Sequence, residues 1–157
     1  MQYRKMSSPL GELVLMGTDN VLERIGFREG KGFIRVHNDW QTSSHAFEDA
    51  VHQLEEYFFG SRKVFDLKLK PCGTSFQLVV LEALSLVPYG KTQSYQDIAN
   101  AVGRPKAVRA VGAASGRNPL PIVIPCHRVI GSDGRLTGFS GGLAAKRYLL
   151  DLEAHEF

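Results

Sequence analysis

SYQDIANAVGRPKAVRAVGAAS, residues 94–115, is the stretch that decides the fold of the carboxyl-terminal half of this chain. Ser94 and the aspartate three residues later have the spacing of a capping box, which predicts a short helix that stops near Gly103. A second helix is expected from about Pro105, a residue suited to the first helical turn, to about Ser115. Two short helices joined by a glycine-containing turn predict a helix-turn-helix.

The second of these helices consists mostly of small residues, and Lys106 and Arg109 are its long side chains. The small residues are Ala107, Ala110, Gly112, Ala113 and Ala114. They let the backbone approach another surface closely, which fits either tight packing against a helix or contact with DNA. If the partner is DNA, Arg109 is the side chain able to reach into it.

The net charge of +3 comes from the second half of the chain, because residues 1–70 carry ten basic and ten acidic residues. Between Asp97 and Asp133 there are five basic residues and no acidic one. They are Arg104, Lys106, Arg109, Arg117 and Arg128. Such a local positive field favours a polyanion as partner, and a solvated basic face without a partner is the alternative.

Residues 1–70 are predicted to form a small α/β scaffold. Two apolar runs, residues 13–15 and 21–27, flank turn residues typical of a hairpin, and residues 32–37 are a possible third strand. Apolar residues at helical spacing then predict a helix over residues 47–58 that stops at the next glycine. No pattern in this half suggests chemistry.

A domain boundary is expected at Pro71-Cys72-Gly73, after which the pattern becomes helical. Thr74 and Gln77 have a second capping-box spacing, which predicts a helix that ends at Pro88-Tyr89-Gly90. The predicted fold class is therefore α+β. A small α/β domain is followed by a mostly helical domain that contains the helix-turn-helix and an active-site loop.

The composition excludes several classes of protein. With 43% hydrophobic and 22% charged residues, the chain lies in the globular range. Cys72 and Cys126 lie far apart without CxxC spacing, which disfavours a zinc ribbon or a disulfide framework and favours a reducing compartment. The longest apolar stretch, residues 78–87, is too short to span a bilayer, and the amino terminus lacks a signal-peptide pattern. We expect a cytoplasmic protein without a membrane partner.

RNPLPIVIPCHRVI, residues 117–130, places three prolines directly before Cys126. The prolines exclude a helix and predict a stiff, extended segment that holds Cys126 in a defined place. An inert buried cysteine is one interpretation. A protease-like pair is another, but neighbours in an extended segment point to opposite faces, so His127 would act on Cys126 only through a water. Metal binding is disfavoured because no second ligand pair is evident.

The residues 125–129, PCHRV, are similar to the signature of the O6-alkylguanine-DNA alkyltransferases. Other segments match this family in order and spacing: residues 74–77, 88–92, 94–95, 109–112, 117–119 and 138–143. The resemblance covers residues 71 to about 153 strongly. It extends more loosely to the amino-terminal part through residues 8–11 and 57–60.

The resemblance implies a ribonuclease H-like domain over residues 1–70, and a DNA-binding, alkyl-accepting domain over residues 71–157. It implies irreversible, stoichiometric repair, in which an alkyl group, mainly methyl, moves from O6 of guanine, or O4 of thymine, to the protein's own cysteine. The partner is double-stranded DNA containing O6-alkylguanine, and a monomer without a cofactor is expected. The amino-terminal metal ligands of some relatives have no evident counterpart here, so no zinc is expected.

Two alternatives remain open beside this reaction. A non-catalytic alkyltransferase-like protein would bind damaged DNA, although such proteins replace the acceptor cysteine and Cys126 is present. A transcription regulator would use the helix-turn-helix but would leave the proline-fixed Cys-His segment unexplained.

Residue by residue, the resemblance makes Cys126 the alkyl acceptor, His127 the base that acts through a water, and Glu153 the carboxylate that orients His127. Asn118 would brace the active-site loop, and Tyr95 would donate a hydrogen bond to the flipped guanine. Glu153 is expected near the end of a helix, where the helix dipole disfavours a negative charge unless a partner compensates it.

The resemblance also assigns residues to the DNA and to the damaged base. Arg109 would fill the place of the flipped base, from a helix that enters the minor groove. The walls of the base pocket would be Pro121, Val129, Phe139 and Ser140. Further contacts to DNA would come from Lys106, Ala110, Arg117 and Arg128.

Overall fold

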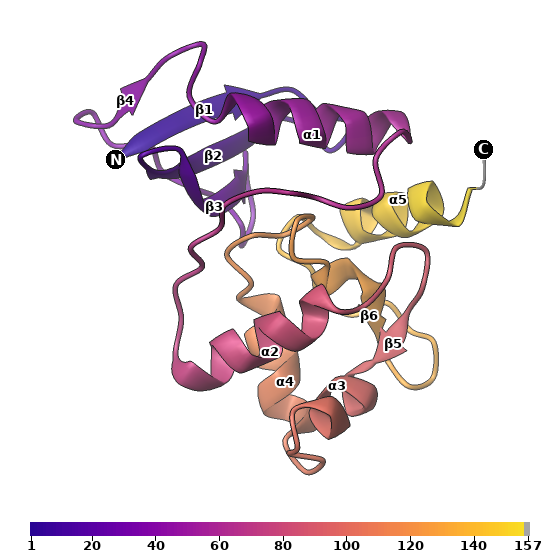
Figure 1. Ribbon diagram of the computed structural model, residues 1–157. Helices are drawn as coiled ribbons and strands as arrows, with labels where there is room; N and C mark the ends of the chain where they lie inside the picture. The colour runs from indigo at the N-terminus through magenta and orange to yellow at the C-terminus, as the bar shows by residue number, and fades with distance from the viewer. Residues whose placement is uncertain (156–157) are drawn as a thin grey trace.

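A mixed β-sheet with one helix forms the amino-terminal part of the computed structural model, which describes residues 1–155 (Figure 1). The strand order is β3-β2-β1-β4, and the bounds are Gln2–Met6 for β1, Leu13–Thr18 for β2, Val21–Phe27 for β3 and Gln41–Thr42 for β4. Asp19 and Asn20 both have positive φ angles, of 53° and 59°, as a tight hairpin turn requires. The predicted hairpin is therefore confirmed.

Helix α1, Glu48–Phe59, packs on the sheet through a buried stripe that includes Val51, Leu54 and Tyr57. Gly60 ends the helix with a φ of 91°, where its N–H bonds to the last carbonyls. Both the helix and its stop agree with the sequence prediction.

The strand predicted over residues 32–37 does not form, and Phe33 makes only an isolated bridge to Phe27. The physical reason is that this segment covers a face of the sheet instead of extending its edge. Ile34 packs with Val14 and Met16 in a small second core. The edge beside β1 is occupied by β4.

The carboxyl-terminal part is mostly helical. Its elements are α2 (Ser75–Ser85), β5 (Gln93–Ser94), α3 (Tyr95–Ala101), α4 (Val108–Gly116), the 3-10 turn η1 (Cys126–Arg128), β6 (Val129–Ile130) and α5 (Leu143–Ala154). Both predicted capping boxes are present, at Thr74 and at Ser94. The α+β fold class is confirmed.

Helix α4 begins three residues later than predicted, because Pro105 lies in a β-turn that precedes the helix. The Ala107 N–H donates to the Arg104 carbonyl at 2.9 Å, which closes this turn and puts Pro105 at its second position. Proline suits that position as well as it suits a first helical turn, so the sequence pattern could not distinguish the two.

One hydrophobic core runs through both parts of the chain and includes Leu54 of α1, Leu84 of α2 and Leu149 of α5. Backbone bonds also join the parts, since Ile25 of β3 donates to the Pro119 carbonyl at 2.9 Å. In Figure 1, α5 lies between α1 and β6. None of the helices within residues 1–155 is long and apolar enough to cross a bilayer.

Candidate active site

Cys126 begins the one-turn 3-10 helix η1 and is buried, with 5% of its surface exposed. The extended segment predicted here is wrong, because residues 119–124 form bends and a turn, in which the Ile124 N–H donates to the Leu120 carbonyl at 2.8 Å, and the Arg128 N–H then donates to the Pro125 carbonyl at 3.0 Å. Proline excludes an α-helix interior but is compatible with turns, so the prolines stiffen a turned segment rather than a straight one. The predicted defined placement of Cys126 agrees with this geometry.

Asn118 holds the segment before Cys126 through both ends of its side-chain amide. Its Oδ1 accepts from the Leu120 N–H at 2.9 Å, and its Nδ2 donates to the Ile124 carbonyl at 2.8 Å. The predicted asparagine-bonded turn is therefore present. Between these contacts Ile122 has a φ of 76°, which is strained for a β-branched residue and needs such bracing.

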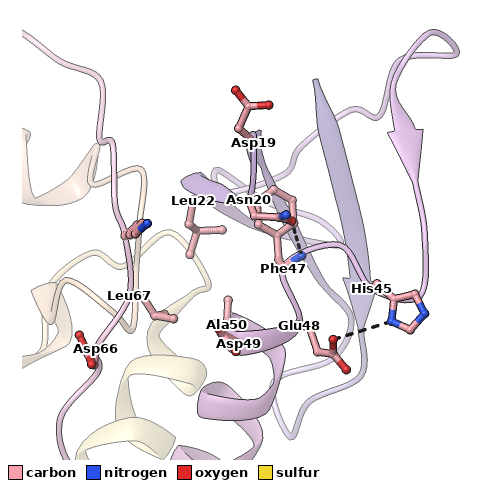
Figure 2. Close-up of a pocket in the computed structure, with 11 residues that line it drawn as sticks. Asp19, Asn20, Leu22, His45, Phe47, Glu48, Asp49, Ala50, Asp66 and Leu67 are labelled. Atoms are coloured by element: carbon pink, nitrogen blue, oxygen red, sulfur yellow. Dashed lines mark hydrogen bonds and ion pairs between the residues drawn. The ribbon is translucent and has the colours of Figure 1, made fainter.

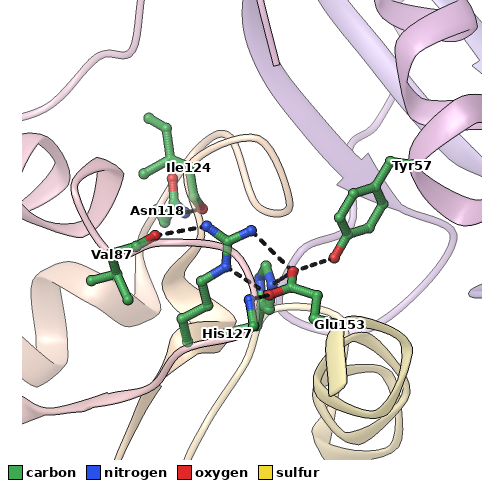
Figure 3. A network of polar contacts seen from close by, with 8 residues as sticks. Tyr57, Val87, Asn118, Ile124, His127 and Glu153 are labelled. Atoms are coloured by element: carbon green, nitrogen blue, oxygen red, sulfur yellow. Dashed lines mark hydrogen bonds and ion pairs between the residues drawn. The ribbon is translucent and has the colours of Figure 1, made fainter. Parts of the chain in front are cut away.

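Glu153, in the last turn of α5, is buried and accepts hydrogen bonds from several donors (Figure 3). The donors are Tyr57 Oη (2.5 Å), His127 Nε2 (2.6 Å), Arg128 Nε (2.7 Å), Arg128 Nη2 (3.1 Å) and the Gly90 N–H (3.2 Å). Burial alone would raise the pKa of Glu153, but the bonds from His127, Arg128 and Tyr57 lower it to about 2. The carboxylate is therefore ionised at neutral pH. The hydrogen bonds from these donors compensate the unfavourable interaction of its negative charge with the helix dipole.

Arg128 belongs to this buried network and is not on the surface, which contradicts its predicted contact with DNA. Its side chain bonds to both oxygens of Glu153, and its Nη1 donates to the Val87 carbonyl at 2.7 Å. The physical reason is that a buried carboxylate needs a counter-charge, which the guanidinium supplies with its fixed fork of donors.

Tyr57 brings the amino-terminal part into the site, although no chemistry was predicted there. It is fully buried on α1, and its hydroxyl points to Glu153 in Figure 3. A tyrosine at a core position needs a hydrogen-bond partner for its hydroxyl, so its place on the buried face of the predicted helix was the signal available in the sequence. Helical spacing alone marked Tyr57 only as a core residue.

The bond to Glu153 fixes the tautomer of His127, which is fully buried. An ionised carboxylate only accepts, so Nε2 carries the proton and Nδ1 is an acceptor in the neutral ring. Burial lowers the pKa of His127, although Glu153 opposes this effect. Among residues 1–155 the buried Nδ1 has no hydrogen-bond partner. The ring is thus neutral at pH 7 and able to accept a proton.

Cys126 is a protonated thiol at neutral pH, because burial raises its pKa to about 11. A hydrogen bond from Asn118 and the charge of Lys146 oppose this effect. Lys146 was not predicted for the site. Its buried ammonium donates to the Val129 carbonyl at 2.7 Å and to the Thr137 carbonyl at 3.0 Å.

Tyr95 lies in the first turn of α3 and is partly buried. Its hydroxyl is 2.5 Å from Thr137 Oγ1, in the loop that follows β6. Burial raises the pKa of Tyr95, and the hydrogen bond with Thr137 lowers it. Thr137 was also missed in the sequence, because nothing local marks it.

The residues predicted to line a base pocket and to contact DNA separate into two sets. Pro121, Val129 and Phe139 are buried, and Ser140 is partly buried. The Phe139 ring lies edge-on to the His127 ring at 6.5 Å, which puts it beside the site. The predicted DNA contacts other than Arg128 are exposed: Lys106, Arg109, Ala110 and Arg117.

A cavity of about 560 Å³ lies in the amino-terminal part, between the β2–β3 turn and the start of α1 (Figure 2). Two contacts join residues of its lining. Asn20 accepts from the Phe47 N–H at 3.2 Å, and His45 lies 3.7 Å from Glu48. No predicted site residue lines this cavity. Within residues 1–155, no three His, Cys, Asp or Glu side chains are grouped to hold a metal ion.

Comparison with known proteins gives a consistent result along the chain. Residues 1–71 match the 6-O-methylguanine DNA methyltransferase, ribonuclease-like domain, and residues 75–155 match the DNA binding domain of the same family. A methylated-DNA–protein-cysteine methyltransferase of Methanosarcina barkeri is 49% identical, over 98% of this chain and 97% of its own. One from Mycobacterium tuberculosis is 46% identical, over 98% and 92%.

Solved structures agree with these sequence matches. Mycobacterium tuberculosis OGT in complex with DNA superposes with a TM-score of 0.91 and 45% identity, covering 98% of this chain and 93% of that one. An O6-methylguanine DNA methyltransferase from Methanococcus jannaschii gives 0.70 and 27%, covering 98% and 95%.

Proposed function

The chain belongs to the 6-O-methylguanine DNA methyltransferase family, and we propose that it repairs O6-methylguanine in DNA by moving the methyl group onto Sγ of its own Cys126. The observation that carries the assignment of the residue is the placement of a buried thiol next to a neutral histidine oriented by an ionised carboxylate. Cys72, in contrast, is exposed.

The first task of the site is to remove the thiol proton. With a pKa of about 11, Cys126 supplies little thiolate at neutral pH, and the thiolate is the nucleophile. His127 Nδ1 accepts the proton through one bridging water. Glu153 stabilises the imidazolium that forms, because its carboxylate is ionised and bonded to Nε2.

The second task is to help guanine leave. The bond from sulfur to the methyl carbon forms while the bond from that carbon to O6 breaks, and the electron pair remains on guanine. Tyr95 donates a hydrogen bond to the edge of the base, where this charge develops. Overall the thiol loses one proton and guanine gains one, so no cofactor or co-reactant is consumed.

The reaction stops after one transfer. The product is a thioether, which has no good leaving group and is not hydrolysed under mild conditions. Each protein molecule therefore repairs one base and remains alkylated. O4-methylthymine is a second substrate of the same site, since the bond that breaks would again join the methyl carbon to an exocyclic oxygen of the base.

The damaged base must leave the duplex to reach a buried thiol, at a cost of a few kcal/mol. Arg109 and Ala110 are exposed on α4, and the helix has small residues around them. This surface fits the minor groove, where Arg109 takes the place of the base. Lys106 and Arg117 are exposed nearby in sequence and bind phosphates.

The protein acts as a monomer in the cytoplasm under this proposal. Both cysteines are free thiols, which fits a reducing compartment. Pro121, Val129, Phe139 and Ser140 form the walls of the base pocket.

The test is to mix the protein with a duplex that contains one O6-methylguanine and to measure the modified nucleoside after digestion of the DNA. We expect O6-methylguanine to become guanine in proportion to the protein added, and Cys126→Ser to show no conversion. Tight binding without conversion by the parent protein would instead support a non-catalytic damage-binding protein.

A further inference from the structure

A second set of contacts near Cys126 involves Tyr95, Thr137 and Lys146 and shares no residue with the Glu153 network. The Tyr95 hydroxyl and Thr137 Oγ1 are 2.5 Å apart, and Lys146 Nζ donates to the Thr137 carbonyl at 3.0 Å. The Lys146 ammonium also lies 5.9 Å from the centre of the Tyr95 ring. Thr137 thus connects the two other residues, through its side chain and its backbone respectively.

We propose that Thr137 is a positioning residue for methyl transfer: its hydroxyl holds and polarises the phenol of Tyr95, and Lys146 fixes the backbone that carries this hydroxyl. This inference rests on the proposed function, because it concerns the residue that helps guanine leave.

The hydrogen-bonding capacity of a phenol allows both contacts at once. The Tyr95 oxygen can accept a bond from the Thr137 hydroxyl while its own O–H donates to the base. A donor to the phenol oxygen stabilises negative charge there, so it makes the phenol a better donor to the departing guanine. The same contact lowers the pKa of Tyr95, against the larger effect of burial.

Both ends of the Tyr95–Thr137 contact are held by the fold. Tyr95 begins α3 directly after the capping box at Ser94. Thr137 itself is exposed, in a loop without regular structure, so the loop alone would not fix its hydroxyl. Lys146 is fully buried and bonds both Val129 of β6 and Thr137, which ties this loop to the strand beside Cys126.

A latch is the competing explanation for the same contact. In that case the bond between Tyr95 and Thr137 would keep the loop closed in the free protein, and the base would have to break it. The latch predicts faster transfer when the bond is removed, whereas positioning predicts slower transfer.

The test compares Thr137→Val with Thr137→Ser in single-turnover transfer from a saturating O6-methylguanine duplex. Valine keeps the shape of threonine without the hydroxyl, and serine keeps the hydroxyl. We expect Thr137→Val to slow transfer about 3- to 10-fold, the effect of one lost hydrogen bond, with unchanged affinity for the duplex. Thr137→Ser should recover most of that rate. Thr42→Val, at an exposed site in β4, is the matched control.

A double-mutant cycle with Tyr95→Phe makes the test specific. Thr137→Val should have no further effect once the phenol oxygen is absent. A Thr137→Val rate equal to or faster than the parent, a Thr137→Ser variant as slow as Thr137→Val, or the same slowing in the Tyr95→Phe background would each overturn the inference. A parent protein that takes up no methyl group would contradict the proposed function itself.

Discussion

The Glu153 network and the Tyr95–Thr137 contact, which we propose both assist Cys126, differ in their exposure to solvent. Glu153, His127 and Arg128 are buried, and their bonds join α5, η1 and α1. Tyr95 is partly buried, and Thr137 is exposed. Removing one partner of a buried ion pair leaves the other charge uncompensated and destabilises the fold, whereas losing a hydrogen bond at the surface changes stability little. Substitutions in the Glu153 network should therefore affect both stability and methyl transfer. Substitutions at the Tyr95–Thr137 contact should affect methyl transfer alone.

Glu153→Gln is expected to have the largest effect. Arg128 would keep a buried charge without its counter-charge, which costs about 3–5 kcal/mol in the free energy of unfolding. Transfer should also slow, because the imidazolium of His127 loses its stabilising charge. Urea unfolding and single-turnover transfer measure the two effects. Asp151→Asn, an exposed change on the same helix, is the control. A Glu153→Gln variant as stable and as fast as the parent would contradict the role of the network.

Arg109→Ala changes another exposed side chain, on α4, so the free energy of unfolding should not change. Only a duplex requires the base to be flipped, so we expect a loss of roughly 10- to 100-fold on duplex DNA. Transfer from free O6-benzylguanine should remain near the parent rate. Equal losses on both substrates would show that Arg109 does not replace the flipped base.

Tyr57→Phe asks whether the amino-terminal part stabilises the site through Glu153. The variant removes one buried hydrogen bond to a charged group, which is worth about 1.5–3 kcal/mol. Thermal unfolding should show a lower Tm, and transfer should slow less than in Glu153→Gln because His127 and Arg128 still hold the carboxylate. Tyr148→Phe, at a more exposed tyrosine of α5, should leave the Tm unchanged.

The pH dependence of transfer is the smallest expected effect. A buried thiol acting alone, with a pKa of about 11, would gain about tenfold in rate per pH unit. With neutral His127 as the base, the rate at saturating DNA should stay nearly flat from about pH 7 to 9. Because the pKa of His127 is lowered, the rate should fall only below its ordinary value of about 6.5. A steady tenfold rise per unit would exclude His127 as the base.

The predictions that the structure confirms rest on local sequence patterns. The capping boxes at Thr74 and Ser94 and the stop at Gly60 depend on residues three or four apart, which a sequence displays directly. The start of α4 was predicted wrongly from Pro105, because proline fits a turn and a helix start equally well.

The site itself could be predicted only where a motif or a resemblance marked it. Cys126, His127 and Glu153 were predicted together, and the structure joins His127 to Glu153. Tyr57, Thr137 and Lys146 were missed because their roles arise from contacts across the fold. Arg128 was misplaced for the same reason, since its positive charge suggested a surface for DNA and its partner Glu153 is 25 residues away.

The central claim is that Cys126 accepts one methyl group, and mass spectrometry after incubation with excess O6-methylguanine duplex tests it most directly. The account predicts a gain of one CH2 per protein molecule, on the peptide that contains Cys126, with no further reaction however much substrate remains. Methyl on the peptide that contains Cys72, or continued conversion beyond one equivalent, would contradict it.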